Sequence, residues 1–306
     1  HAGMHEYAQT PFDTQARTYD NNGNYIGTAS FSVVVSYDGN NQMTLYSAGG
    51  AQGTYAYDAL GRRIVKTSGG VTTRYAYAGE RVIEEFDSQL RTQYVYGNYL
   101  DEVLQERKYT SLTTSDDYWF HTDDMFNTTA VTDSAGAVVE RYEYGDYGAP
   151  EFYAADWTPR TSSAIGNAIL FTGRPYDAES GWYNLRARYL DPKVGRFTTR
   201  DPKGIWGDAA NLGNGYTYAN NNPWSYMDPY GLEAGSNMEI TGSDIMRAME
   251  RALQQDGATG DFAKGFFLDA IADMGVSIMD AFGAMREFLS NPAGYLTDKL
   301  DMIQSV

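Results

Sequence analysis

Tyrosines recur two positions apart along most of the chain and give the first structural signal. Residues at i and i+2 lie on the same face of a β-strand, so each Tyr-x-Tyr triplet places two rings on one side of a sheet. The triplets are YAY at 55–57, YAY at 75–77, YVY at 94–96, YEY at 142–144 and YTY at 216–218. Tyr-Asp pairs at 19–20, 37–38 and 57–58 are spaced by 18 and 20 residues. The pattern predicts a strand unit that repeats along the chain.

Turn-forming residues separate these strand-like stretches. They are NNGN at 21–24, DGNN at 38–41, SGG at 68–70 and SAG at 134–136. Asn-Gly and Asp-Gly accept the positive φ angles of tight hairpin turns. Because one hairpin cannot bury its tyrosine face alone, we expect neighbouring hairpins to stack into one curled antiparallel sheet with stacked rings on its inner face. A β-sandwich rich in tyrosine is the alternative.

The pattern changes after residue 232, where apolar residues return at helical spacing. Thr241 and Asp244 precede a stripe typical of a capped amphipathic helix; the stripe consists of Ile245, Met249 and Leu253. A second stripe continues to the SNP sequence at 290–292; it consists of Phe262, Phe266, Ala270, Met274, Ile278, Phe282, Met285 and Leu289. The predicted fold class is mainly β, a curled antiparallel sheet of repeated hairpins followed by an α-helical C-terminal segment.

Composition narrows the class of protein. With 306 residues, 42% of them hydrophobic and 14% aromatic, the chain can bury a large core. The net charge of −17 opposes binding to phosphate backbones, so we expect no nucleic-acid partner. The absence of cysteine removes disulfides and thiolate chemistry, and no apolar run is long enough to cross a bilayer as a helix. The chain starts at His1 without a signal-peptide pattern, and we expect the natural amino terminus to lie upstream.

Three segments carry a resemblance to a known family. The segment YAYDALGRRIVKTSGGVTTRYAY at 55–77 resembles the YD repeats of rearrangement-hotspot (Rhs) proteins. FTGRPYDAESGWYNLRARYLDPKVGRFTTRDP at 171–202 and YTYANNNPWSYMDPYGL at 216–232 resemble the Rhs-repeat-associated core. The family includes the C components of Tc toxins. The resemblance implies a spiral β-sheet shell around a toxic C-terminal segment, and a core domain that cuts the chain after the final leucine of a DPxGL motif.

The resemblance also implies a division into three parts. Residues 1–160 would form a YD-repeat shell segment that is incomplete at its N-terminus. Residues 161–232 would form the Rhs-repeat-associated core with its self-cleavage motif. Residues 233–306 would form a helical segment, either cargo or a plug that joins the shell to an effector. Contact of these helices with a membrane is the less favoured alternative to their packing on each other or on the shell.

The chemistry of such a cut can be examined from the residues themselves. Peptide hydrolysis needs a general base for water, a general acid for the leaving amine and stabilisation of the oxyanion. His121, in HTDDMFN, lies near no serine-nucleophile motif, which leaves carboxylates. Two carboxyl groups held close together cannot both ionise, so such a pair serves as acid and base at once. The candidates are Asp201, in TTRDPKG, and Asp228, in MDPYGL, each restricted by the proline that follows.

By resemblance, Asp201 and Asp228 match the catalytic pair of the Rhs core. Arg188, in LRARYLDP, matches the arginine beside them. Its permanent charge would hold one aspartate ionised or bind the oxyanion. Asp-Pro also occurs at Asp191-Pro192, where we expect only a turn, since a lone Asp-Pro pair is usually a turn.

The resemblance places the cleaved bond between Leu232 and Glu233. Pro229 and Gly231 would support the turn, because glycine lets the backbone bend sharply enough to present the Leu232 carbonyl. The stretch GIWGDAANLGNGY at 204–216 is longer than the usual family spacing, and this insertion would either form an outer loop or shift the pair. We expect no metal and no cofactor, since the HTDD stretch at 121–124 is more typical of a solvated loop than of a metal site.

Two functions follow as alternatives. The first is a single-turnover aspartyl autoprotease within a toxin-encapsulating shell that frees its own C-terminal segment as cargo. Its further partners would be the remaining shell or components of a secretion apparatus, and it would be secreted, on the cell surface or delivered by a secretion system. The second is a non-enzymatic cell-surface or wall-associated scaffold whose C-terminal helices bind a partner.

Overall fold

A computed structural model describes residues 6, 16–30, 32–111, 113–203 and 213–236. The chain divides into two compact units, His1–Thr241 and Gly242–Val306. The second unit, and with it the predicted helical stripes, lies outside the described residues, as does the 204–212 stretch of the inserted loop. All described residues belong to the first unit.

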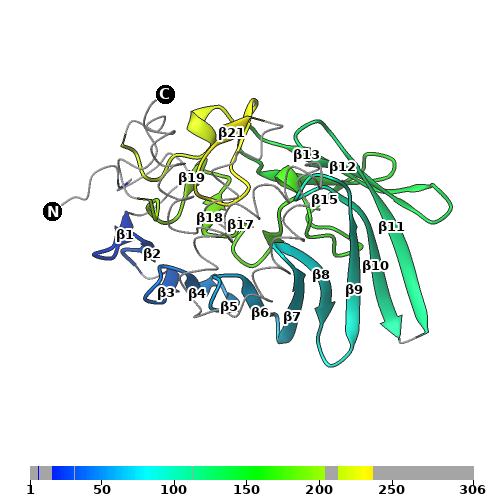
Figure 1. Ribbon diagram of the computed structural model, residues 1–306, viewed down its shortest axis with the longest axis horizontal. Coiled ribbons are helices and arrows are strands. Elements are labelled where there is room, and N and C mark those ends of the chain that lie inside the picture. Colours follow the sequence, from blue (N-terminus) through cyan, green and yellow to red (C-terminus); the bar gives the residue numbers. More distant parts are fainter. Residues whose placement is uncertain (1–5, 7–15, 31, 112, 204–212, 237–306) are drawn as a thin grey trace, which may run out of the picture. The chain divides into compact units, whose positions relative to one another are not determined.

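A 15-stranded antiparallel sheet dominates this unit, and its strand order is the order in the sequence (Figure 1). The predicted curled sheet of consecutive hairpins is confirmed, and the described strands form no closed barrel. The strands are β1 Arg17–Tyr19, β2 Tyr25–Thr28, β3 Val33–Tyr37, β4 Met43–Ala48, β5 Ala51–Tyr57, β6 Arg63–Ser68, β7 Val71–Ala78, β8 Arg81–Phe86, β9 Leu90–Tyr96, β10 Val103–Ser111, β11 Thr114–Thr122, β12 Thr128–Asp133, β13 Val138–Tyr144, β14 Pro150–Ala154 and β15 Pro159–Arg160.

Two smaller sheets follow in the chain. One has four antiparallel strands, β16 Tyr176–Asp177, β17 Trp182–Leu185, β18 Arg188–Asp191 and β19 Arg196–Phe197. The other is the hairpin of β20 Tyr226–Met227 and β21 Gly235–Ser236. In the described part of the chain, the short 3₁₀ helices η1 Phe171–Gly173 and η3 Ala219–Asn221 connect these elements.

The aspartate of each Tyr-Asp pair closes the turn ahead of it. In the turn after β3, one carboxylate oxygen of Asp38 accepts the backbone N–H groups of Asn40 and Gln42, each at 2.9 Å. The same contacts to positions i+2 and i+4 recur at Asp20, Asp58, Asp123 and Asp133. Aspartate thus replaces the missing strand partner of two backbone donors, which explains why it recurs at these turns.

The tyrosine pins the open end of the hairpin behind it. The hydroxyl of Tyr57, at the end of β5, donates to the carbonyl of Met43, at the start of β4, at 2.8 Å. Equivalent bonds join Tyr37 to Tyr25, Tyr77 to Arg63, Tyr96 to Val82 and Tyr144 to Thr128. Each bond gives the ring a partner for its polar end while its apolar part is packed. Each Tyr-Asp pair therefore combines two contacts. The tyrosine hydroxyl bonds across the open end of the preceding hairpin, and the aspartate carboxylate caps the turn that follows.

The same tyrosines mark irregularities that bend the sheet. Tyr37 lies opposite Met43 but Ser36 lies opposite Leu45, so one residue of β4 is left unpaired. Register shifts occur at the equivalent positions of Tyr19, Tyr57 and Tyr77. Such bulges increase the local twist and bend the strand. Their repetition at the same place in successive hairpins accounts for the curl.

One face of the large sheet packs on the four-stranded sheet through aromatic rings. The Trp182 ring of β17 meets Tyr46 of β4 edge-on with 5.1 Å between ring centroids, and Tyr189 of β18 lies 5.9 Å from Tyr55 of β5. A second cluster includes Val131 of β12, Tyr142 of β13 and Phe171 of η1. The predicted inward stacking of tyrosines is thus observed in these rings.

The YTY triplet at 216–218 departs from the strand pattern. These residues lie in a turn after the insertion, with only an isolated bridge from Thr217 to Arg196. Tyr216 and Tyr218 are almost fully buried. Tyr218 packs on Phe197 with 5.7 Å between ring centroids. Here tertiary packing, rather than a neighbouring strand, holds the alternating rings.

Buried charges connect the large sheet to the four-stranded sheet. Asp177 of β16 is 1% exposed and pairs with Arg63 and, at 2.7 Å, with Lys66 of β6. Burial is unfavourable for each charge, but the guanidinium and ammonium groups more than offset it and lower the pKa of Asp177. Removing one partner of such a pair would leave a buried charge uncompensated.

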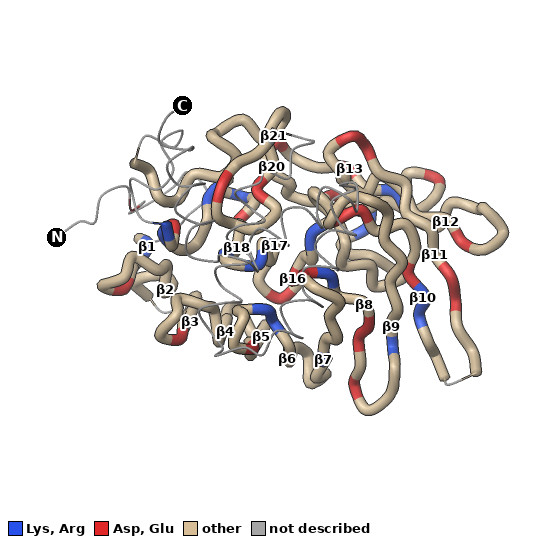
Figure 2. Tube along the Cα trace, viewed as in Figure 1, with Lys and Arg blue, Asp and Glu red and all other residues tan. Residues whose placement is uncertain are grey.

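Charged residues of both signs also lie along β8–β11 (Figure 2). Glu106 of β10 is 1% exposed and lies opposite Tyr94 of β9 and Tyr118 of β11. Burial raises the pKa of Glu106 to about 7, although the Lys108 ammonium at 3.3 Å opposes the shift. The carboxylates of Glu85 and Glu140 raise the pKa of Glu106 further.

This burial makes the stability of the sheet depend on pH. Because the pKa of Glu106 is higher in the folded than in the unfolded chain, its contribution is full below about 4.5 and is lost as pH rises through about 7. We expect the free energy of unfolding of wild type, relative to Glu106→Gln, to fall by roughly 2–3 kcal/mol between pH 5 and pH 8. Denaturant titrations at both pH values measure this difference. The exposed Glu143→Gln is the control, and a Glu106→Gln profile parallel to wild type would contradict the assignment.

Candidate functional site

Arg188, Asp201 and Asp228 come together in one buried cluster. Arg188 is the first residue of β18, Asp201 follows β19, and Asp228 comes directly after β20. Their exposed fractions are 2%, 6% and 2%. Nη2 of Arg188 lies 3.1 Å from Oδ2 of Asp201 and 3.3 Å from Oδ2 of Asp228. Two carboxylates from distant parts of the chain therefore share one guanidinium nitrogen.

The rest of the Arg188 side chain is also fully engaged. Its Nη1 donates to the carbonyl of Gly215 at 3.0 Å, and its Nε donates to the carbonyl of Gly231. The guanidinium carbon lies 3.6 Å from the centroid of the Phe197 ring. Arginine keeps its charge in such a site, and its planar fork allows contact with several acceptors at once. Arg188 thus links the segments that carry the two aspartates.

Asp228 caps the loop that joins β20 to β21. Its Oδ1 accepts the backbone N–H of Leu232 at 2.8 Å and of Glu233 at 3.0 Å. The N–H of Gly231 donates to the main-chain carbonyl of Asp228 at 3.2 Å. The two carboxylate oxygens are therefore divided, one facing Arg188 and the other facing the peptide nitrogen between Leu232 and Glu233.

The pKa of Asp228 is raised. Burial is the main cause, and the neighbouring carboxylate of Asp201 adds to it. The Arg188 guanidinium and the two backbone N–H groups oppose the shift without cancelling it. The protonated form of Asp228 therefore persists to higher pH than in an ordinary aspartate.

Asp201 is held in the cluster by backbone contacts with Gly215 and Lys203. Its backbone N–H donates to the carbonyl of Gly215 at 2.9 Å, and its Oδ1 accepts the N–H of Lys203 at 2.8 Å. The Lys203 ammonium lies 2.6 Å from a carboxylate oxygen of Glu233. The segment after Asp201 thus contacts the residue on the C-terminal side of the Leu232–Glu233 bond.

The loop itself is close against the β17–β18 hairpin. Gly231 has a φ of +66°, and a Cβ there would lie 2.5 Å from the carbonyl oxygen of Leu185 and 3.0 Å from the nitrogen of Arg188. Only glycine fits this approach. The carbonyl of Pro229 accepts a bond from Arg186, a residue that our sequence analysis did not select. The available signal was its place two residues before Arg188 in LRAR.

The other candidate residues lie elsewhere. Asp191 belongs to β18 and pairs with Arg17 at 3.1 Å rather than with the cluster. His121 lies on β11, with its Nε2 3.1 Å from the hydroxyl of Thr132. Across the described ranges, no group of three or more histidine and acidic side chains is arranged to hold a metal ion. In that same part of the chain, no helix has the length and apolar character to cross a membrane.

Comparison with known proteins shows the family. The family model of the Teneurin YD-shell matches residues 10–224. The chain belongs to the YD-shell family. The Rhs/YD-repeat resemblance of the sequence is thereby confirmed. The matched range contains Arg188 and Asp201 and ends before Asp228 and the loop that follows it.

Curated relatives of this YD-shell chain are much longer proteins. It is 33% identical over 230 residues to the tRNA(Glu)-specific nuclease WapA of Bacillus subtilis subsp. natto, covering 72% of this chain and 9% of that protein. It is 31% identical over 228 residues to the double-stranded DNA deaminase toxin A of Burkholderia cenocepacia, covering 66% of this chain and 15% of that toxin. The chain therefore spans less than a sixth of either relative.

A solved structure shares the fold. The crystal structure of TcdB2-TccC3-Cdc42 superposes with a TM-score of 0.56 at 20% identity, covering 70% of this YD-shell chain and 11% of that chain. At this identity the likeness concerns the fold alone.

The tight loop of the YD-shell core gives a stability prediction. We expect Gly231→Ala to lower the free energy of unfolding by roughly 2–4 kcal/mol, because the new Cβ adds a backbone clash to the strain of a left-handed conformation. Gly136→Ala is the matched control, since it has a φ of +76° but no atom within 4 Å of the new Cβ. Its loss should stay near 1–2 kcal/mol, the strain alone. Equal losses in denaturant titrations would show that the contact with Leu185 and Arg188 is unimportant.

Proposed function

We propose that this chain is the C-terminal part of an Rhs-type encapsulating shell that cuts its own backbone once, between Leu232 and Glu233. Asp228 and Asp201 would act as acid and base, with Arg188 binding both. In this proposal residues 1–160 belong to the shell, 161–232 form the self-cleaving core and 233–306 are the segment that is separated.

One observation carries the proposal. Oδ1 of Asp228 lies 3.0 Å from the backbone nitrogen of Glu233, the leaving nitrogen of this cut. Its other oxygen shares Nη2 of Arg188 with Asp201. A carboxyl group within hydrogen-bond reach of the leaving group and beside a second carboxyl group meets the geometric requirement for general acid catalysis.

The chemical steps balance with water as the only co-reactant. The water oxygen attacks the carbonyl carbon of Leu232 while Asp201 accepts a proton from the water. Protonated Asp228 gives its proton to the nitrogen of Glu233 as the C–N bond breaks, which leaves a Leu232 carboxylic acid and a Glu233 amine; the acid then loses its proton to solvent. Since Asp228 must be protonated for this step, the rate would decline as pH rises through its raised pKa.

The relatives suggest the setting of such a cut. Two of them are named as a tRNA nuclease and a DNA deaminase toxin, and the structural neighbour is a TcdB2-TccC3 assembly. By analogy, the partners of this chain would be its own C-terminal segment as enclosed cargo and further components of a toxin complex. Delivery outside the producing cell follows from the same analogy.

A structural role for Asp228 is the second candidate. Asp20, Asp38, Asp58, Asp123 and Asp133 use one carboxylate oxygen to cap their turns, much as Asp228 does. A cell-surface or wall-associated scaffold would need no more than this cap. The two candidates differ in the contact with Asp201 through Arg188, which those five turns do not need.

Intact-mass analysis distinguishes the two candidates. We expect the wild-type 306-residue chain, made by timed cell-free synthesis, to give two fragments that end at Leu232 and begin at Glu233. Asp228→Asn and Asp201→Asn should each slow the cut at least about a hundredfold, since one group of an acid–base pair is lost.

The control uses the third Asp-Pro pair. Asp191→Asn removes an equally buried carboxylate that lies in a different ion pair, so the two fragments should still appear. A single uncut mass for wild type and for all three variants would leave the scaffold as the function.

A further inference from the structure

Three consecutive residues of the β17–β18 hairpin hold three consecutive carbonyls of the loop that joins β20 to β21, residues 228–234, which we call the cleavage loop after the proposed cut. The Arg186 side chain donates to the carbonyl of Pro229, the Ala187 backbone N–H donates to that of Tyr230 at 3.1 Å, and the Arg188 side chain donates to that of Gly231. The next carbonyl along the chain is that of Leu232. The hairpin therefore sets the position of the backbone immediately before the Leu232–Glu233 bond.

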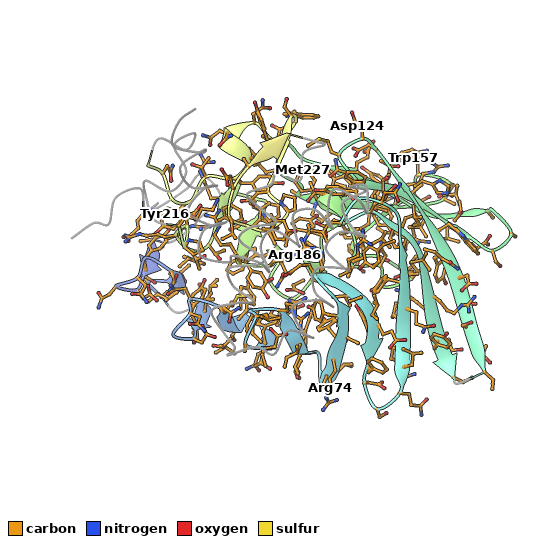
Figure 3. All side chains as sticks on the ribbon, in the orientation of Figure 1. Arg74, Asp124, Trp157, Arg186, Tyr216 and Met227 are labelled. Atoms are coloured by element: carbon orange, nitrogen blue, oxygen red, sulfur yellow. The ribbon has the colours of Figure 1, made fainter. Side chains whose placement is uncertain are left out.

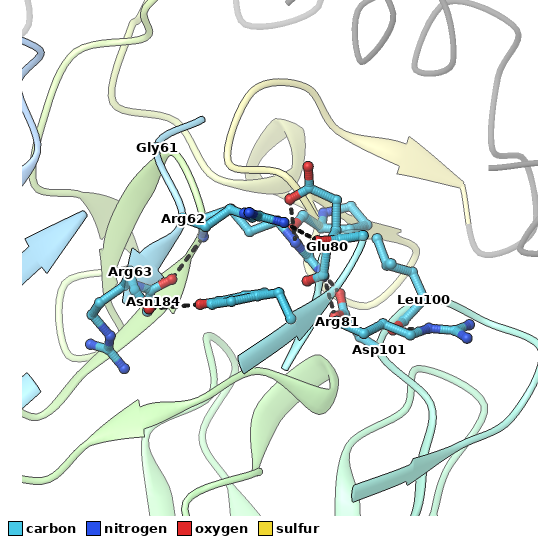
Figure 4. A network of polar contacts seen from close by, with 12 residues as sticks. Gly61, Arg62, Arg63, Glu80, Arg81, Leu100, Asp101 and Asn184 are labelled. Atoms are coloured by element: carbon cyan, nitrogen blue, oxygen red, sulfur yellow. Dashed lines mark hydrogen bonds and ion pairs between the residues drawn. The ribbon is translucent and has the colours of Figure 1, made fainter. Parts of the chain in front are cut away.

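Arg186 differs from Arg188 in its other partners. It lies at the turn of the hairpin with a φ of 60°, and its guanidinium carbon lies 5.3 Å from the centroid of the Tyr230 ring. Its Nη1 and Nη2 donate to the carboxylate of Asp101 at 3.1 Å and 2.7 Å. The turn between β7 and β8 contributes Glu80, whose carbonyl lies 3.4 Å from Nη2. Arg186 is labelled in Figure 3, and Figure 4 labels Glu80 and Asp101 in a close view of the polar contacts in this region.

Asp101 connects Arg186, and through it the contact with the Pro229 carbonyl, to the large sheet. It lies in the segment between β9 and β10 and is 4% exposed. Its second partner is Arg174, at 2.7 Å, which in turn donates to the carbonyl of Asn184 at 2.8 Å and 3.0 Å. Burial opposes ionisation, but Arg174 and Arg186 more than offset it and lower the pKa of Asp101. Asp101 is thus an anion placed between two cations of the core.

The close packing here leaves little freedom. Gly173 lies so near Asp101 that a Cβ would come within 2.0 Å of the Asp101 carbonyl oxygen. Arg81, at the start of β8, donates to the carbonyl of Leu100 at 3.2 Å. The 97–102 segment is therefore held both by β8 and by the core, and Arg186 is its connection to the cleavage loop.

We propose that Arg186 is a positioning residue that transmits the docking of the β7–β8 and β9–β10 hairpins to the Pro229–Gly231 backbone, so that the cut occurs only after these hairpins have docked on the core. This inference rests on the proposed self-cleavage. Without Asp101 and Glu80, Arg186 would have no anchor on the large sheet, and the Pro229 carbonyl would lose a fixed donor. A cut before docking would separate the C-terminal segment from a shell that is not yet assembled.

The test compares two aspartates with matched surroundings. Asp101 binds Arg174 and Arg186, and Asp177 binds Arg63 and Lys66; both aspartates are buried and both link the large sheet to the core. Within the described part of the chain, the partners of Asp101 contact the cleavage loop through Arg186, and those of Asp177 do not. In timed cell-free synthesis of the full chain, we expect Asp101→Asn to slow the appearance of the two fragments roughly ten- to a hundredfold. Asp177→Asn should stay within about threefold of wild type.

Stability is measured separately, in an uncut background. Each substitution is combined with Asp228→Asn, and the midpoint of thermal unfolding is compared. A positioning role predicts slower cutting from Asp101→Asn than from Asp177→Asn even where both lose similar thermal stability. Equal slowing by the two variants would overturn the inference.

A second variant covers the case in which Asp101→Asn does not fold. Arg186→Gln removes the contact with Pro229, and Lys66→Gln is its control in the Asp177 cluster. We expect slow cutting only for Arg186→Gln, with partial recovery in Arg186→Lys, which retains the charge. If wild type is cut, Asp228→Asn is not, and Arg186→Gln is cut at the wild-type rate, the positioning role fails while the proposed function stands. If wild type is never cut, the proposed function itself fails.

Discussion

The Arg188 guanidinium is a permanent charge removed from water, and this fact constrains everything around it. Such a cation is tolerated only when fixed acceptors replace its hydration. Two carboxylates, two backbone carbonyls and an aromatic ring do so, and they come from residues between Phe197 and Gly231. The chain segments that supply them must therefore converge. Because the charge needs these acceptors, Asp201 and Asp228 are brought together beside the loop that joins β20 to β21.

The large sheet solves a different problem with few residue types. Its consecutive hairpins need closed turns, fixed open ends and a bend toward the core. Aspartate caps the turns, the tyrosine hydroxyl forms a hydrogen bond across the open end of the hairpin, and bulges beside the tyrosines bend the sheet. Because each contact lies within one hairpin or between neighbours, the architecture can be extended by repetition without redesign.

Much of this could be predicted from the sequence because it is local. The Tyr-x-Tyr triplets at 55–57, 75–77, 94–96 and 142–144 all lie in strands. The turn signals at 21–24, 38–41 and 134–136 lie between strands, and the signal at 68–70 covers the end of β6 and the turn that follows. The motif resemblance also selected Arg188, Asp201 and Asp228, which the fold brings into contact.

What the sequence did not reveal depends on contacts between distant residues. Arg186 resembles any arginine in a hairpin turn until Asp101 and Pro229 are placed beside it. Glu106 follows an alternating strand pattern in which a charged residue is expected to face water, yet it is buried opposite two tyrosines. The triplet at 216–218 has the strand pattern but no strand ladder with any described residue. The partners of Arg186 and of the 216–218 triplet lie too far along the chain for periodicity to indicate them. The partners of Glu106 lie on the adjacent strands, but periodicity does not indicate that a charged side chain is buried there.

The last strand of the large sheet has a consequence for self-association. β15 contains only Pro159 and Arg160, and proline offers no N–H to an incoming strand. A sheet edge that is this short and lacks one of its donors is a poor template for pairing with another chain. Recruitment of a foreign strand, and the aggregation that follows from it, is thereby discouraged at this border.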